Sequence, residues 1–540
     1  MNDMLKMIIL FLKRYKYTIV VFIYFQIIVY FQIRTAWHRG PYLFYLLNAS
    51  SLLLILHLIS KSKLIIRIAL IVIFSLLIAF EAYYAFFFNC SISLGIISSI
   101  MVTNITEVTD VMRGRILPSI IIFALSIFVI FKTVNELKIK TIPAKWSVLL
   151  LSAYMFVCFP LYVFRKIKKD ADFDLNYTGS AIRTCQMIIT ERFPLIYGQI
   201  SSVLVSIQEM QQVKKNLLRN RILLEGVSWK DEEWLPEKIY FVLGESQYRE
   251  HLSLYGYDVK TTPFLDSLYQ SSSKMTIYNA ISPGCTTLDV TRLLFTYATP
   301  SNLNPFFTHK NIIELANDAG YQTVWLSNQT TFDQWGGIIT FISSLSNDTY
   351  FTGYEDITKN IDDLSLIPKL REKYIKNMKQ FFVVHLQGSH GSYSTKYDKI
   401  DEIAIKGNNT KNQYDRSIHH TDRVLKEIYH VMKNDSSSIL FYISDHGENI
   451  EMGGHGYLIG DLSQFEVPMF IINQSEIDVN AIVDKYFLHK KNRINTLSSI
   501  NILTEWMGYS YADEIISEVR EQSNYIYHAD GRTYKYDELE

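Results

Sequence analysis

Three predicted strands each run into a loop that carries a residue able to bind a metal ion. These residues are Glu245, His390 and the adjacent pair Asp445 and His446. Carboxylate and imidazole groups are common protein ligands of Zn²⁺. A single carboxylate at a strand end is more often a loop cap, but the pair followed by Gly447 is a stronger signal, because a small neighbour lets the backbone bend around an ion. The three loops together predict a metal cluster.

A candidate nucleophile follows the turn signal Pro283-Gly284. Thr286 and Asp289 fit a Thr-x-x-Asp capping box, which predicts that a helix begins there with Thr287 in its first turn. The backbone N–H groups of a helix N-terminus suit a phosphoryl group. A threonine hydroxyl attacks only when a base or a metal activates it. The motif is therefore consistent with Thr287 as a nucleophile beside a metal.

Two other interpretations of this motif stay open on the residues alone. Both threonines can be helix caps without chemistry. Cys285 is a rival nucleophile, although a cysteine at a helix start without a paired histidine motif is more often inert. The four cysteines of the chain provide no disulfide framework and no zinc-finger spacing.

The elements that must position these residues lie in the second half of the chain. Short β-branched and aromatic runs alternate with helical patterns such as 311–319 and 414–432. This alternation predicts an α/β domain with a mostly parallel central sheet and helices on both faces. Ligands bind at the carboxyl ends of the strands in such sheets. The predicted strands are residues 239–243, 323–326, 381–386, 439–443 and 468–472.

The first part of the chain is dominated by apolar residues, and five of its stretches are long enough to span a bilayer. Lys and Arg concentrate before the first stretch and in every second loop, which predicts a cytoplasmic N-terminus and an external C-terminal domain. The cluster from Arg165 to Lys169 opposes this rule and is either a contact with lipid phosphates or a solvated helix end. The predicted spans are residues 17–33, 42–60, 64–88, 116–134 and 145–164.

Three regions follow from this pattern. We expect a transmembrane domain with five helices over residues 1–165, bridging amphipathic helices and a linker over 166–235, and a catalytic domain over 236–540. An ordinary packed linker is the alternative for the middle region.

The formal net charge is zero, so no overall field favours nucleic acid, and we expect no nucleic-acid partner.

The motifs together resemble the phosphoethanolamine transferases of the bacterial envelope, a family of the alkaline phosphatase/sulfatase superfamily that includes the lipid A modifying enzymes behind colistin resistance. The resemblance covers nearly the full chain. Its most specific part is the run from Gly244 to Arg249 followed by Leu252-Ser253-Leu254-Tyr255-Gly256-Tyr257, which is similar to the family's first zinc motif.

The resemblance implies a role for each site residue. Glu245, Asp445 and His446 match the family's zinc ligands, and Thr287 matches its zinc-bound nucleophilic threonine. His390 and His455 match histidines of the substrate pocket. Thr103 and Glu107, in Thr103-Asn104-Ile105-Thr106-Glu107, match a motif implicated in binding the donor lipid.

The resemblance further implies a zinc-dependent transfer of phosphoethanolamine from phosphatidylethanolamine, through a phosphothreonine, to a lipopolysaccharide or another glycan. The protein would be a monomer in the bacterial inner membrane, with its catalytic domain in the periplasm. The alternatives are a phosphoglycerol transferase or phosphodiesterase of the same superfamily, and a catalytically dead membrane sensor.

Some sequence features differ from those of the lipid A enzymes, so the resemblance does not identify the acceptor molecule. This chain lacks their disulfides, and it has no basic residue shortly after Trp325. Its Trp325-x-x-Asn328-Gln329 pattern is more similar to the branch that modifies core heptoses or other glycans.

Overall fold

The computed structural model describes residues 2–34, 42–102, 112, 114–138, 143–158, 160–161, 164, 181–193, 195–216, 220–232, 234–329, 337–352, 362–452 and 454–539. The chain forms two compact units. The first consists of Met1–Ser98, Val111–Ser206 and Tyr457–Ile459, and the second of Ser99–Asp110, Ile207–Gly456 and Gly460–Glu540.

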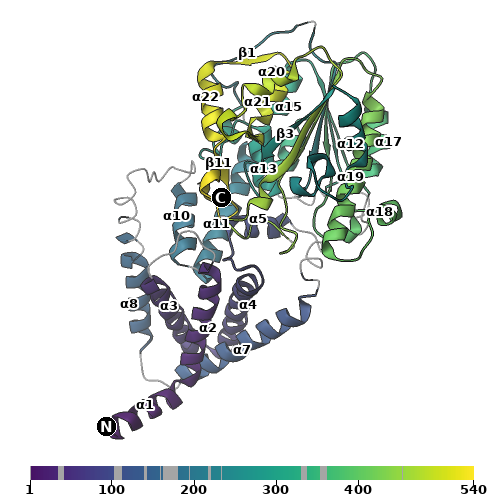
Figure 1. Ribbon diagram of the computed structural model, residues 1–540. Coiled ribbons are helices and arrows are strands. Elements are labelled where there is room, and N and C mark those ends of the chain that lie inside the picture. Colours follow the sequence, from purple (N-terminus) through teal and green to yellow (C-terminus); the bar gives the residue numbers. More distant parts are fainter. Residues whose placement is uncertain are drawn as a thin grey trace. The chain divides into compact units, whose positions relative to one another are not determined.

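The first unit is a helical bundle built from the apolar stretches of the sequence (Figure 1). Four of its described helices are long and apolar enough to cross a membrane. Their inward faces form an apolar core that includes Phe25, Leu52 and Ile78, while apolar side chains such as Ile65 and Leu117 are exposed, as contact with lipid requires. The four helices are α2 (Lys16–Ile33), α3 (Tyr42–Lys61), α4 (Leu64–Phe88) and α7 (Ile116–Lys138).

The fifth predicted span is shorter among the described residues than the sequence pattern indicated. Helix α8 (Ala144–Ala153) continues as one π-helical segment, Tyr154–Cys158, and the two together are too short to count with the four long helices. The count of five spans and the orientation of the chain stay predictions. The basic cluster 165–169 lies outside the described residues.

Four further helices accompany the bundle helices in the sequence. They are α1 (Asn2–Arg14), α5 (Leu94–Val102), α10 (Ala181–Arg192) and α11 (Ile196–Asn216). The last two fall in the region predicted to hold bridging helices. Whether they lie on a membrane surface stays a prediction.

The second unit is built on an eight-stranded sheet with the strand order β5-β4-β6-β2-β7-β8-β3-β9. Five of the seven strand pairs are parallel, and only β8 runs against both of its neighbours, β7 and β3. The prediction of a mostly parallel sheet is confirmed. The strands are β2 (Lys238–Gly244), β3 (Met275–Ile281), β4 (Gln322–Ser327), β5 (Asp348–Phe351), β6 (Gln380–His385), β7 (Ser438–Ser444), β8 (Glu466–Asn473) and β9 (Ile494–Asn495).

Helices cover both faces of this sheet (Figure 1). Alternate residues of β2 face opposite sides, so that Phe241 belongs to one apolar core and Val242 to the other. The helices packed with the Val242 core are α12 (Pro263–Ser271), α17 (Leu366–Lys373) and α19 (Thr410–Met432), with α18 (Lys399–Ala404) next to α19. The helices on the Phe241 side are α13 (Thr287–Phe295), α15 (Ile312–Asp318), α16 (Ile338–Ser343), α20 (Val479–Asp484) and α21 (Ser499–Glu505).

Smaller elements complete the second unit. Helices α14 (Pro305–Thr308) and α22 (Asp513–Gln522) are accompanied by two antiparallel two-stranded sheets. One sheet pairs β1 (Val227–Trp229) with β10 (Tyr509–Tyr511), and the other pairs β11 (Tyr525–Tyr527) with β12 (Thr533–Lys535).

The sequence pattern missed three strands of the central sheet. Strand β3 lacks a continuous apolar run because its middle residues are only partly buried, and β5 and β9 are short. The sequence pattern also could not predict that β8 is antiparallel to its neighbours, because a buried strand has the same apolar sequence pattern in either direction.

Candidate active site

The metal-binding candidates meet where two neighbouring parallel strands end. The register pairs Gly244 of β2 with Ser444 of β7. Glu245 and Asp445 follow these residues directly, so the sheet brings together two carboxylates that are far apart in the sequence. His446 is the next residue of the β7 loop. The structure therefore brings Glu245, Asp445 and His446 to one edge of the sheet.

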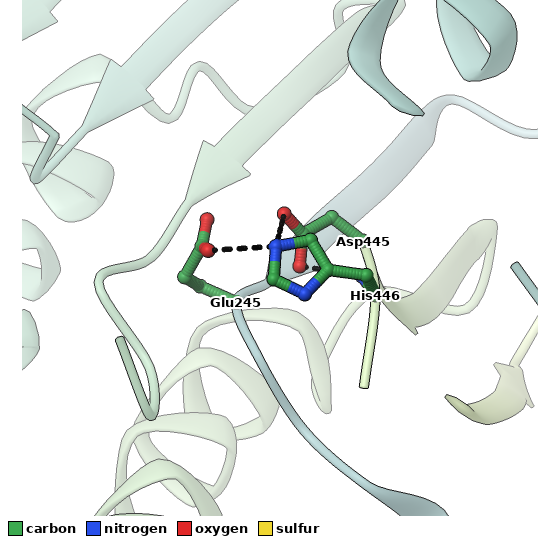
Figure 2. A group of neighbouring side chains, drawn as sticks. All are labelled: Glu245, Asp445 and His446. Carbon is green, nitrogen blue, oxygen red and sulfur yellow. Dashed lines mark hydrogen bonds and ion pairs between the residues drawn. The ribbon is translucent and has the colours of Figure 1, made fainter. Parts of the chain in front are cut away.

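Three side chains of this edge converge on one point (Figure 2). His446 Nε2 lies 3.3 Å from Glu245 Oε1 and 3.3 Å from Asp445 Oδ2. One ligand atom from each residue lies within 4.8 Å of the other two, and all three side chains are fully buried. Two carboxylates and an imidazole in this arrangement form a compact site for a metal ion.

The hydrogen bonds around the cluster leave the ligand atoms facing inward. The Nδ1 atom of His446 lies 2.8 Å from the Gly447 carbonyl and donates to it, so Nε2 faces the two carboxylates. Asp445 Oδ1 accepts from the backbone N–H groups of Ser246 and His446, at 3.0 and 2.6 Å. Its other oxygen, Oδ2, is buried and has no hydrogen-bond partner. This oxygen and the inward Nε2 fit a bound cation.

The pKa values of the three groups reflect their mutual charges. Burial by itself disfavours the imidazolium of His446, but Asp445 and Glu245 raise its pKa to about 10. Burial and the charge of Glu245 raise the pKa of Asp445 to about 6. Burial also works against ionised Glu245, but the hydrogen bond and charge of His446 lower the pKa of that carboxyl. Without a metal, the proton on His446 therefore supplies the positive charge that the two carboxylates require.

Thr287 lies directly on this cluster. It is the first residue of α13, and its hydroxyl donates to Glu245 at 3.0 and 3.2 Å from the two carboxylate oxygens. The same Oγ1 atom is 3.4 Å from His446 Nε2. The hydroxyl thus lies beside the candidate metal ligands and at the start of a helix, where backbone N–H groups can bind an anion.

The predicted capping box at this helix is wrong, although the helix begins where expected. Thr286 is the N-cap residue but makes no side-chain cap. Its hydroxyl donates instead to the Asp289 carboxylate at 3.0 Å. A hydroxyl turned toward that carboxylate does not accept the backbone N–H of the first turn. The competing Cys285 is fully buried, and burial raises the pKa of its thiol well above the usual value, which disfavours a thiolate.

The two predicted pocket histidines are connected through Glu448, a residue whose role the sequence reasoning missed. His455 Nδ1 lies 3.1 Å from Glu448 Oε2, and its ring centroid is 3.9 Å from that of His446. His390 is close enough for its charge to act on the same carboxylate. Burial raises the pKa of Glu448 to about 7 and lowers the pKa of His455 to about 3. The position of Glu448, two residues after His446, was the only signal in the sequence.

The loop after β4 supplies another residue that the sequence reasoning left without a role. Gln329 donates through Nε2 to Glu245 Oε2 at 3.3 Å and to the Leu386 carbonyl at 3.0 Å. It thereby connects Glu245, a candidate metal ligand, to the loop that follows β6. Thr103 and Glu107, the predicted donor-lipid residues, lie outside the described residues.

A second group of possible metal ligands, Asp362, Asp398 and His420, lies elsewhere in the unit. Its negative charge is already matched by cations of the chain. Arg423 lies 2.8 Å from Asp398, and His420 lies between Asp362 and Asp401 at 2.7 and 2.8 Å. This group is an ion-pair network.

Comparison with known proteins identifies the class of this chain. The sulfatase family model matches residues 238–510, which is half of the chain, and the chain belongs to this family. The match spans the sheet and all the site residues from Glu245 to His455. The resemblance to phosphoethanolamine transferases that the motifs indicated is also confirmed by individual relatives.

Three relatives describe this similarity. Phosphoethanolamine transferase EptC of Escherichia coli O18:K1:H7 (strain RS218 / NMEC) is 27% identical over 261 residues, 45% of each chain. The structure of lipooligosaccharide phosphoethanolamine transferase A (EptA) from Neisseria meningitidis covers 91% of each chain with a TM-score of 0.60 and 16% identity. The zinc complex of the periplasmic domain of E. coli EptC covers 59% of this chain and 97% of that domain, with a TM-score of 0.50 and 22% identity.

These comparisons establish the family and the fold. The chain matches about half the length of the curated relative, and both structural similarities fall below 25% identity. The full-length similarity to EptA agrees with apolar helices followed by an α/β domain, so the expected fold class is confirmed.

Proposed function

We propose that this protein transfers phosphoethanolamine from phosphatidylethanolamine to a lipopolysaccharide, at lipid A or the core, or to another envelope glycan. The observation that carries the proposal is the Thr287 hydroxyl, 3.0 Å from Glu245 and 3.4 Å from His446, at the first residue of α13. The names of the relatives support the transferred group. The long apolar helices support a lipid donor, because they keep the catalytic unit on a membrane.

The metal that this site would hold is zinc. Glu245, Asp445 and His446 would be its protein ligands, together with the Thr287 oxygen. The inward Nε2 atom and Asp445 Oδ2, which is buried and accepts no hydrogen bond, support this assignment, and a zinc complex exists for one structural relative. When bound, zinc would act as a Lewis acid that makes the threonine hydroxyl more acidic and neutralises charge at the phosphoryl group.

The proposed reaction gives each step to a residue of this chain. Thr287 Oγ forms a bond to phosphorus while the bond from phosphorus to the diacylglycerol oxygen breaks. The hydroxyl proton leaves along the hydrogen bond to Glu245, and the diacylglycerol oxygen takes up a proton. Glu448 is the candidate donor of that proton, because its pKa is about 7 and it lies beside His455. The N–H groups at the start of α13 stabilise the phosphoryl oxygens.

The second half of the reaction restores the enzyme. A hydroxyl or phosphate oxygen of the acceptor attacks the phosphothreonine, its bond to phosphorus forms, and the bond to Thr287 Oγ breaks. A hydroxyl acceptor loses its proton, and Thr287 regains one.

The proposed location is the bacterial inner membrane, with the N-terminus in the cytoplasm, the catalytic unit in the periplasm and the protein acting as a monomer.

A donor experiment tests this function. The full-length protein would be reconstituted in nanodiscs that contain either phosphatidylethanolamine or phosphatidylglycerol, supplied with zinc, and analysed by intact-protein mass spectrometry. We expect a phosphoethanolamine adduct with the first lipid and none with the second. A phosphoglycerol adduct alone would favour a phosphoglycerol transferase. No adduct and no released diacylglycerol with either lipid would indicate a catalytically dead protein.

The acceptor needs a separate measurement. Mass spectrometry of lipid A, core and other glycans from a deletion strain should show the loss of phosphoethanolamine from one of them. Unchanged phosphoethanolamine on every envelope glycan would contradict the proposed acceptor class.

A further inference from the structure

The residue between the metal ligand Glu245 and Gln247 has an unusual backbone. Ser246 has a φ of +56°, in the left-handed region, and its side chain is completely buried. Residues with a Cβ atom rarely adopt this conformation, whereas glycine adopts it at little cost. Strained backbone of this kind persists where the surrounding structure holds it, often at functional sites.

The left-handed turn brings Ser246 into contact with both metal-binding carboxylates. Its backbone N–H donates to Asp445 Oδ1 at 3.0 Å, and its hydroxyl donates to Glu245 Oε1 at 3.1 Å. On the other side, the Tyr414 hydroxyl donates to the Ser246 carbonyl at 2.8 Å and fixes the turn.

The loop after β6 contacts the same turn. Ser389 donates its backbone N–H to the Glu245 carbonyl at 2.9 Å. Gly388 has a φ of +49°, and a Cβ atom there would come within 2.8 Å of the Glu245 carbonyl oxygen. The Glu245–Ser246 turn is therefore held from two directions, which explains how the left-handed serine persists.

A glycine at position 246 would supply the same backbone N–H without strain. The contribution that requires serine is its hydroxyl, which points at Glu245. We propose that Ser246 is a positioning residue for the metal site. Its N–H fixes the orientation of Asp445 and its hydroxyl fixes the orientation of Glu245, so that both carboxylates face His446. The inference rests on the proposed function, because it assumes that the cluster binds zinc.

Two variants separate the hydroxyl from the backbone. Ser246→Gly removes the hydroxyl and the strain, and Ser246→Ala removes only the hydroxyl. Partners that orient metal ligands typically contribute 10- to 100-fold to affinity. We therefore expect both variants of the full-length protein to bind zinc about 10- to 100-fold more weakly, as measured by competition with a chelator. In excess chelator, Ser246→Gly should unfold at or above the wild-type temperature, which a purely structural role for the hydroxyl would not allow.

Ser392 offers a matched control. It is also a left-handed serine, with a φ of +60°. Its carbonyl accepts from the backbone N–H and the hydroxyl of Thr395, and within the described part of the chain no hydrogen bond joins it to Glu245 or Asp445. Ser392→Gly should keep the wild-type affinity for zinc. An equal loss of affinity in this control would show a general effect of loop strain and overturn the inference.

The remaining outcomes distinguish the inference from the proposed function. Zinc binding that Asp445→Asn removes, but that Ser246→Gly and Ser246→Ala leave at wild-type affinity, would overturn the role of Ser246 and leave the proposed function standing. Weaker zinc binding in Ser246→Ala but not in Ser246→Gly would show that backbone conformation, and not the lost hydroxyl, changes the affinity. That result would also overturn the positioning role of Ser246. A wild-type protein that binds no zinc would overturn both.

Discussion

The substitution Thr287→Ala separates the chemistry of the site from its stability. It removes a hydroxyl that donates to Glu245 at 3.0 Å. A hydrogen bond to a charged group contributes about 1.5–3 kcal/mol. Glu245 keeps other partners, namely the Ser246 hydroxyl at 3.1 Å and Gln329 at 3.3 Å. We therefore place the loss of folding free energy near the lower limit, at about 1–2 kcal/mol.

The expected loss of activity is much larger. Removing a catalytic nucleophile typically lowers turnover by at least about 10,000-fold, equivalent to about 5.5 kcal/mol at the transition state. A destabilisation of about 1–2 kcal/mol shifts the unfolding temperature of a domain of this size by only a few degrees, on the order of 2–8 °C. Thr287→Ala should thus remain folded at assay temperature and lose transfer almost completely.

The assay is intact-protein mass spectrometry after incubation with phosphatidylethanolamine and no acceptor, followed by peptide mapping. The wild type should carry the adduct on Thr287, and Thr287→Ala should carry none. Thr287→Ser keeps the hydroxyl and is the matched control, in which an adduct should form.

Three results would refute the reasoning about the nucleophile. An adduct that maps to Cys285 or Thr286 would show that another residue attacks. Transfer that persists in Thr287→Ala without an adduct would refute the covalent mechanism. A Thr287→Ser protein as inactive as Thr287→Ala would show that the hydroxyl alone does not explain the role of this residue.

Three further predictions concern protons, loops and topology. In the metal-free protein at pH 8, His446 holds a proton because its pKa is about 10. Zinc binding should therefore release about one proton per ion in a buffered-indicator titration, and the apparent zinc affinity should rise with pH up to about 10. Zinc binding without proton release would contradict this prediction. The buried Asp363 carboxylate accepts hydrogen bonds of 2.7–2.9 Å from Asn328 Nδ2 and from the backbone N–H groups of Gln387 and Gly388. Asp363→Asn should therefore lower the free energy of unfolding by about 1–3 kcal/mol. An unchanged thermal melting curve would contradict this prediction. A reporter fused after residue 169 should be periplasmic and one fused near residue 138 cytoplasmic, and the reverse result would refute the proposed orientation.

The strand ends show how far the sequence was informative about the site. Glu245, Asp445 and His446 each follow a buried apolar run, and parallel strands end at a common edge of a sheet. This general rule places the three residues near one another without any knowledge of packing. The apolar stretches were equally informative, because a helix that crosses a membrane needs length and hydrophobicity, and both are properties of the local sequence.

The details of the site depend on contacts that the sequence pattern leaves open. The Thr286 hydroxyl binds Asp289 instead of capping the helix, and local sequence allows both arrangements. Glu448 becomes part of the site only because the chain folds His455 back against it. The left-handed conformation of Ser246 is imposed by Asp445 and Tyr414, which belong to other elements of the fold.

The sequence by itself therefore determined the apolar helices, the mostly parallel sheet and the residue types at the edge that holds the candidate site, because these follow from hydrophobic periodicity and local turns. Only the tertiary structure decided which oxygen of Asp445 stays without a hydrogen bond, which nitrogen of His446 faces the carboxylates and how Thr287 meets Glu245. These distances depend on the register between β2 and β7 and on the packing of α13 against the sheet. Both are set by contacts between residues that are remote in the chain.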